Sequence, residues 1–218
     1  MSRTIEEQRI NPKRAERPWP ECSDEELLLE YRREGDRDAF DELVHRYERP
    51  LYSYLRRYLG DANLAEDAFQ TTFLQVHLKC DQFEPGRKVR PWLYTIATNQ
   101  AIDAQRRNKR HQMVSLDRRN ARAGQEEVGA LLDLLSSSDS TPPERIEATE
   151  RRNWVRKAIA DLPEPLRVAV TLIYYEGLKY REAAEVLEIP VGTVKSRLHT
   201  AITKLSEAWQ SAHRSGKG

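Results

Sequence analysis

Residues 180–199 read YREAAEVLEIPVGTVKSRLH, and this stretch predicts a helix-turn-helix. The small side chains of Ala183 and Ala184 suit the close crossing of two short helices. A tight turn follows, with Glu188 at a position where such motifs often have Gly. If this residue is left-handed, Glu in place of Gly costs roughly 1 kcal/mol.

The second helix of this motif is expected to begin at Gly192 and Thr193, with Thr193 as its N-cap. Residues at helical spacing predict its buried stripe, which comprises Val194, Leu198, Ile202 and Leu205. Residues beside the stripe can reach base edges and phosphates when such a helix enters the major groove. These candidates are Lys195, Ser196, Arg197, His199 and Thr200. The alternative is an ordinary helical hairpin with a basic outer face.

Helical spacing of apolar residues recurs on both sides of this motif, and we find no alternation typical of strands. We therefore predict an all-α fold of two small helical domains joined by a flexible linker. Ser23 and Glu26 form a capping box at the start of the first helix, which Gly35 ends. Pro50 lies inside the segment with the clearest period, where it is expected to kink or split the helix.

Composition and charge divide the chain further. The predicted parts are a disordered N-terminal extension (1–22), a first helical domain (23–112), a linker (113–143), the helix-turn-helix domain (144–212) and a tail (213–218). Residues 114–150 carry four basic and eight acidic side chains, and residues 151–218 carry twelve and seven. Residues 87–110 carry seven more basic side chains and one acidic side chain. Two basic zones separated by an acidic connector favour nucleic-acid binding, although solvated helix faces are the alternative.

Several classes of protein are excluded by what the sequence lacks. It has no apolar run of about 18 residues that would span a membrane, and its N-terminus lacks the apolar stretch of a secretory signal. The two cysteines form no CxxC pair, and the five histidines show no zinc-ligand spacing. We find no GxSxG, HExxH or phosphate-binding glycine loop. We expect a cytoplasmic protein that is not an enzyme and that uses no cofactor or metal.

Residues 177–205, GLKYREAAEVLEIPVGTVKSRLHTAITKL, closely resemble region 4 of ECF (extracytoplasmic-function) sigma factors, a subfamily of the bacterial sigma-70 family. Residues 65–77, AEDAFQTTFLQVH, resemble the polymerase-binding helix of region 2 in that family. Residues 83–110 resemble the segment that opens and reads the minus-ten promoter element. A helix-turn-helix alone is common, whereas these matches in this order are specific.

The resemblance implies that region 2 binds core RNA polymerase at the clamp helices of its largest subunit, and that the flap is a second contact. The matching positions are Asp67, Gln70, Thr71 and Phe73. The family usually has Glu where Thr71 stands, and Phe73 could instead pack in the core.

The resemblance also implies two sets of DNA-binding residues. The minus-ten set comprises Phe83, Arg87, Lys88, Arg90, Asn99, Asp103, Arg106 and Arg107. Phe83 could stack a flipped base or belong to the core, Trp92 is expected in the core, and Asp103 could pair with an arginine such as Arg107. The minus-thirty-five set comprises Thr193, Lys195, Ser196, Arg197, His199 and Thr200. Many relatives have Arg where Thr200 stands, so the promoter preference is expected to differ.

The implied function is that of a sigma factor, which binds core polymerase, recognises promoter DNA and separates its strands. An anti-sigma factor is an expected partner, and the acidic linker is expected near the RNA channel of the polymerase. Two alternatives remain open. One is a helix-turn-helix regulator that acts without replacing the sigma factor, and the other is a degenerate sigma-like adaptor that opens no promoter.

Overall fold

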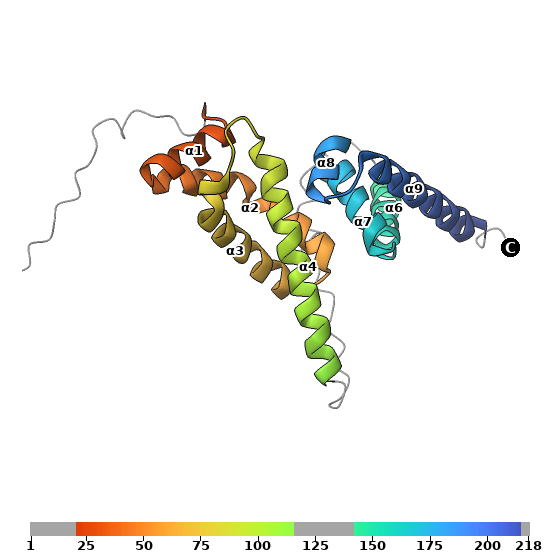
Figure 1. Cartoon of the computed structure of the whole chain (residues 1–218). Helices are drawn as coiled ribbons and strands as arrows, with labels where there is room; N and C mark the ends of the chain where they lie inside the picture. Colours follow the sequence, from red (N-terminus) through yellow and green to blue (C-terminus); the bar gives the residue numbers. More distant parts are fainter. Residues whose placement is uncertain (1–20, 116–141, 215–218) are drawn as a thin grey trace, which may run out of the picture.

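A computed structural model describes residues 21–115 and 142–214, and it is helical throughout these ranges apart from turns and short connections. The all-α prediction is confirmed. Figure 1 labels the elements, which are α1 (Asp24–Glu34), α2 (Arg37–Leu59), α3 (Ala62–Lys79), a 3-10 turn η3 (Cys80–Gln82), α4 (Val89–Ser115), α6 (Pro142–Ala160), α7 (Glu164–Val170), a π-helical segment η4 (Thr171–Tyr175), α8 (Tyr180–Val186) and α9 (Val191–Arg214). Most of the predicted N-terminal extension and most of the predicted linker lie outside the described residues.

Helices α1 to α4 form one bundle, here called the N-terminal domain (Figure 1). The predicted capping box starts α1, where Glu26 accepts from the Ser23 backbone and the Ser23 hydroxyl accepts from the Glu26 amide. Helix α2 continues through Pro50, so the predicted split does not occur. Tyr47 and Leu51, on either side of Pro50, are both buried in the same core, and this shared packing keeps the helix continuous.

Helices α6 to α9 with η4 form the C-terminal domain, and α8 and α9 are the predicted helix-turn-helix. Glu188 lies in the turn with φ 53°, so the left-handed conformation considered from sequence is present. Two expectations for α9 are wrong. The Pro190 carbonyl accepts from the amides of Thr193 and Val194, so the helix begins earlier and Thr193 is not its N-cap.

The second correction concerns the buried stripe of α9. Ile202 is 49% exposed, whereas Ala201 is completely buried. The rotation of α9 against α7 and α8 thus brings Ala201 between Leu198 and Leu205, and Ile202 lies toward solvent. A small residue at this point allows the helices to approach closely.

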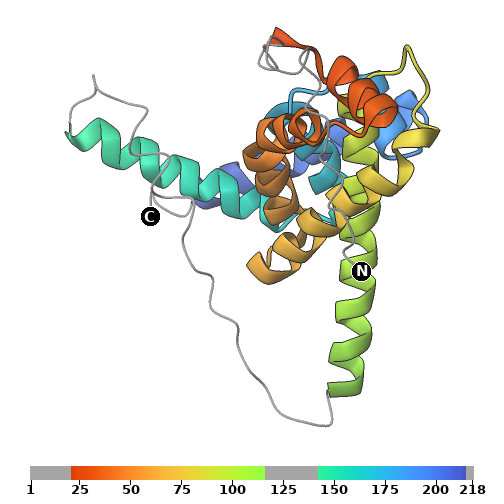
Figure 2. The same cartoon turned by 90° about the vertical axis from the view of Figure 1, so that its left-hand side faces the viewer.

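The two domains lie against each other. Helix α4 contacts α8, and α2 contacts α7 and η4. Figure 1 shows α8 next to the upper part of α4, and Figure 2 shows the lower part of α4 extending beyond both bundles. Among the described helices, none combines the length and apolar character needed to span a bilayer.

The left-handed backbone at Glu188 gives a test of the turn. Because Gly has no Cβ to resist a positive φ, Glu188→Gly should raise the free energy of unfolding by about 1 kcal/mol relative to Glu188→Ala. Both variants remove the same exposed side chain, so the comparison isolates the backbone conformation. Urea unfolding followed by circular dichroism measures the difference, and equal stability of the two variants would contradict a left-handed residue at this position.

Candidate polymerase and nucleic-acid interfaces

Three of the four predicted polymerase-binding residues lie together on one side of α3. Asp67, Gln70 and Thr71 line a shallow pocket of about 430 Å³, and Arg107 of α4 also lines it. The fourth, Phe73, is 7% exposed and its ring lies edge-on to Phe69 with centroids 5.1 Å apart. Its side chain is therefore a core group, which was the alternative considered from sequence.

Two further residues on α3 were missed by the sequence analysis. Leu74 and Leu78 are 54% and 59% exposed, although each is a large apolar side chain. They follow Asp67 and Thr71 at steps of three and four, and therefore lie along the same face of the helix. Their position outside the buried line of Ala65, Ala68 and Val76 was the signal that could have revealed them.

The predicted minus-ten residues on α4 are all exposed, and they comprise Asn99, Asp103, Arg106 and Arg107. Asp103 pairs with Arg106 at 3.8 Å, so its arginine partner is one position earlier than the one suggested from sequence. The opposite face of α4 holds buried side chains such as Leu93 and Ala97. Because its other face is packed in the core, α4 holds these exposed polar residues in a fixed position.

Phe83 does not offer its ring to solvent. The side chain is 2% exposed, and the ring packs on Trp92 with centroids 5.1 Å apart. Trp92 is 8% exposed, as expected for a core residue. In this structure Phe83 therefore cannot stack a flipped base, because its ring and that of Trp92 are both buried in the core.

The basic residues just before and at the start of α4 are paired with carboxylates or carbonyls. Lys88 lies 3.7 Å from Glu25. Arg87 donates to the Glu185 carboxylate of α8 from Nε at 2.8 Å and also from Nη2. Arg90 donates from Nη2 to the backbone carbonyl of Glu176. Of the three basic side chains in this segment that were predicted to contact minus-ten DNA, Arg87 and Arg90 are thus hydrogen-bonded to the C-terminal domain.

Glu176 is the centre of the contact between the domains, and with Arg57, Arg90 and Tyr94 it forms the Glu176 cluster. Its side chain is almost fully buried. Oε1 accepts from Arg57 Nη1 at 3.1 Å, and Oε2 accepts from the Tyr94 hydroxyl at 2.7 Å. Burial raises the pKa of the Glu176 carboxyl, opposed by these hydrogen bonds and by the neighbouring arginines.

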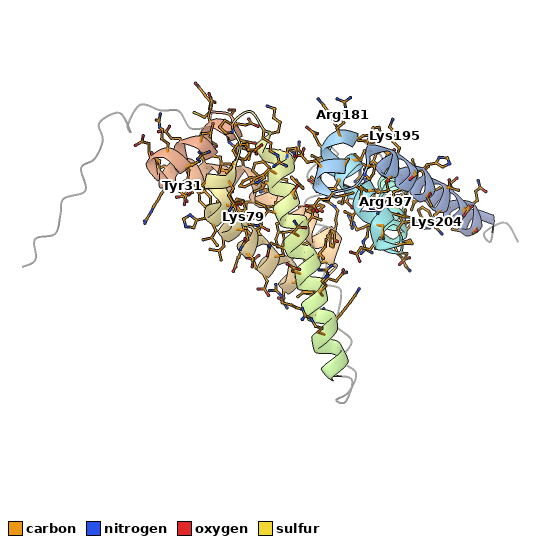
Figure 3. The ribbon with its side chains drawn as sticks, in the orientation of Figure 1. Tyr31, Lys79, Arg181, Lys195, Arg197 and Lys204 are labelled. Carbon is orange, nitrogen blue, oxygen red and sulfur yellow. The ribbon has the colours of Figure 1, made fainter. Side chains whose placement is uncertain are left out.

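The predicted minus-thirty-five residues lie on the first turns of α9. Lys195, Ser196, His199 and Thr200 are exposed, and Thr193 and Arg197 are partly exposed. The hydroxyls of Ser196 and Thr200 donate to backbone carbonyls of α9, at Thr193 and Ser196. Lys195 lies 5.9 Å from the ring centre of Tyr180. Figure 3 shows Lys195 and Arg181 on the same side of the C-terminal domain.

The chain matches two family models. Residues 43–111 match sigma-70 region 2, and residues 152–205 match sigma-70 region 4. These ranges cover most of α2, α3 and α4 in the N-terminal domain and most of the C-terminal domain, without the start of α6 and the end of α9. The exposed rows on α3, α4 and α9 therefore belong to two regions of a single family.

Similar proteins cover most of the chain. The ECF RNA polymerase sigma factor SigW of Bacillus subtilis is 34% identical over 77% of this chain and 87% of its own length. The RNA polymerase sigma-H factor of Pseudomonas aeruginosa is 33% identical over 85% and 94%. The ECF RNA polymerase sigma-E factor of Escherichia coli K12 is 33% identical over 81% and 90%.

Two solved structures share the fold at 24% identity. CnrH in complex with the cytosolic domain of CnrY matches with a TM-score of 0.61 over 87% of this chain and 99% of that chain. The sigma factor RpoE in complex with the anti-sigma factor NepR from Bartonella quintana matches with 0.60 over 78% and 96%. The chain belongs to the ECF sigma factors of the sigma-70 family, and it is not an enzyme but a protein that directs RNA polymerase to promoters for transcription initiation.

Proposed function

We propose that the exposed residues of α3, α4 and α9 have three separate roles, which are polymerase binding, minus-ten recognition and minus-thirty-five recognition. The α3 face with Asp67, Gln70 and Thr71 binds core polymerase at the clamp helices of the largest subunit. Leu74 and Leu78 extend this face, because exposed leucines beside polar groups are typical of a protein interface. The C-terminal domain contacts the flap.

The polar row of α4 is proposed to read and open the minus-ten element. Asn99 has both a donor and an acceptor for a base edge, and Arg106 and Arg107 supply charge for the backbone. The observation that carries this assignment is that these side chains are exposed along one helix whose other face is anchored in the core. Arg87, Lys88 and Arg90 follow the melted strand, while Phe83 supports the loop from inside.

The first turns of α9 are proposed to enter the major groove at the minus-thirty-five element. Lys195, Arg197 and His199 offer donors and charge on the exposed side of the helix, and Thr193, Ser196 and Thr200 complete this set. Thr200 supplies a hydroxyl where many relatives have Arg. One fewer cation weakens the salt-dependent part of DNA binding.

The division of the chain into 23–112, 113–143 and 144–212 stays a proposal, as do the extension and the tail at either end. We place the protein in the cytoplasm, with core polymerase. An anti-sigma factor is proposed as a further partner, since one of the two solved structures that share the fold is a sigma factor in complex with an anti-sigma factor.

Transcription on a natural template tests the proposed role of α4. With core polymerase and the promoter region upstream of its own gene, the protein should produce specific run-off transcripts. The double variant Arg106→Ala plus Arg107→Ala should reduce them at least tenfold, because two cations near the DNA are lost. Arg151→Ala plus Arg152→Ala, two exposed arginines on α6, is the matched control and should leave transcription unchanged. Equal transcription by both double variants would contradict the assignment.

Core binding tests the proposed role of α3 and separates it from DNA reading. Asp67→Ala plus Leu74→Ala should weaken binding to core polymerase about tenfold or more, as expected when polar and apolar contacts of one interface are removed together. Asn63→Ala, also exposed on α3, should bind as the wild type does. Fluorescence anisotropy of the labelled protein measures the affinity. Tight core binding without transcripts from genomic templates would favour the degenerate adaptor.

A further inference from the structure

The two arginines at the end of the polar row of α4 lie on different sides of the helix. Successive residues of an α-helix are turned by about 100°, so Arg106 lies about 20° from Asn99 around the helix axis and Arg107 about 80° from it. Helix α4 packs against α3 (Figure 1), and Arg107 lines one pocket with Asp67 of α3. The sequence placed both arginines in one set, whereas the structure brings Arg107 next to the residues assigned to polymerase.

The pocket of about 430 Å³ has one wall from each helix. Asp67 lies on the wall that α3 forms, and Ala104, Arg107 and Asn108 of α4 form the other. Ala104 is 2% exposed, so the core holds this part of α4 in place. The side chains of Asp67 and Arg107 are exposed, and a partner can therefore reach both.

The two charged groups of this pocket are not neutralised within the N-terminal domain. Among the described residues, neither the Asp67 carboxylate nor the Arg107 guanidinium has an ion-pair or hydrogen-bond partner, and they do not pair with each other. The uncharged groups beside them are engaged within α3. Gln70 Nε2 donates to Glu66 Oε1 at 2.9 Å, and the Thr71 hydroxyl donates to the Asp67 carbonyl at 2.7 Å. An anion for Arg107 and a cation for Asp67 must therefore come from a partner.

Protein side chains fit this pair of charges better than a nucleic acid does. A phosphate that entered the pocket would be attracted by Arg107 but repelled by the carboxylate of Asp67. A helix with acidic and basic side chains can satisfy both charges at once, and a guanidinium binds a carboxylate through two parallel hydrogen bonds. The pocket is shallow and continues the α3 face that carries Leu74, so it suits a broad protein surface rather than an enclosed small molecule.

We propose that Arg107 has a second role, as part of the polymerase-binding surface. There it receives an acidic side chain of core polymerase, while Asp67 receives a basic one. Arg106 stays on the side of Asn99, with the residues that face minus-ten DNA. The inference rests on the assignment of α3 to core polymerase, and it gives α4 two functional sides, one for each partner.

Binding of the full-length chain to core polymerase without DNA tests this role, because no phosphate backbone is present. Arg107→Ala should weaken binding roughly fivefold or more, as the truncation of an arginine in an interface pocket commonly does. Arg107→Lys keeps the charge but loses the planar fork, so it should bind with an intermediate affinity. Lys109→Ala is the matched control, since it removes an exposed cation from nearly the opposite side of α4 and should bind as the wild type does.

Fluorescence anisotropy of the labelled chain measures these affinities, and circular dichroism should show unchanged helix content because Arg107 is exposed. Equal affinities of Arg107→Ala and Lys109→Ala would overturn the role of Arg107. The variant Asp67→Ala plus Leu74→Ala, measured in the same series, reports on α3 alone. If it binds weakly while Arg107→Ala binds normally, the α3 assignment stands and the inference fails. If neither variant is weakened, both fail.

Discussion

The buried carboxylate of Glu176 determines how the two halves of the described structure are related. It belongs to the C-terminal domain, yet both of its side-chain hydrogen bonds come from Arg57 and Tyr94 of the N-terminal domain. Removing a carboxylate from water is costly, and these directed bonds offset that cost in one relative position of the domains. The domains also meet where Tyr58 donates to Glu164 and where Arg87 donates to Glu185.

The exposed ion pair of Arg87 with Glu185 contributes less. Both side chains are about 40% exposed, so water and salt weaken their attraction. The pair matters because Arg87, which donates to Glu185, is also a residue that we propose to contact the DNA backbone. In this structure that cation is engaged by the C-terminal domain.

Local sequence patterns were sufficient for the helices. Apolar residues at steps of three and four located α2 and α9, and Gly35 marked a helix end that the structure shows as a left-handed cap. The patterns failed where packing decides. Whether Ala201 or Ile202 faces the core depends on how α9 rotates against its neighbours, and the burial of Phe73 and Phe83 depends on aromatic partners elsewhere in the bundle.

The contact between the domains had no local signature. Arg57 and Glu176 are separated by 119 positions, and neither lies in a sequence motif that predicts their contact. The resemblance to a family located the exposed rows of α3, α4 and α9, which is most of the candidate site, but it says nothing of which carboxylates cover them. Only the folded chain shows that Asn99 and Arg197 line one pocket.

The central claim is that this chain opens promoters with core polymerase, and strand separation can be observed directly. Permanganate oxidises thymines that are unstacked, so the promoter upstream of the protein's own gene is treated after core polymerase and the full-length chain are added. The account predicts reactive thymines around the minus-ten element only when both proteins are present. Stable complexes on DNA that leave every thymine in that element unreactive would contradict it.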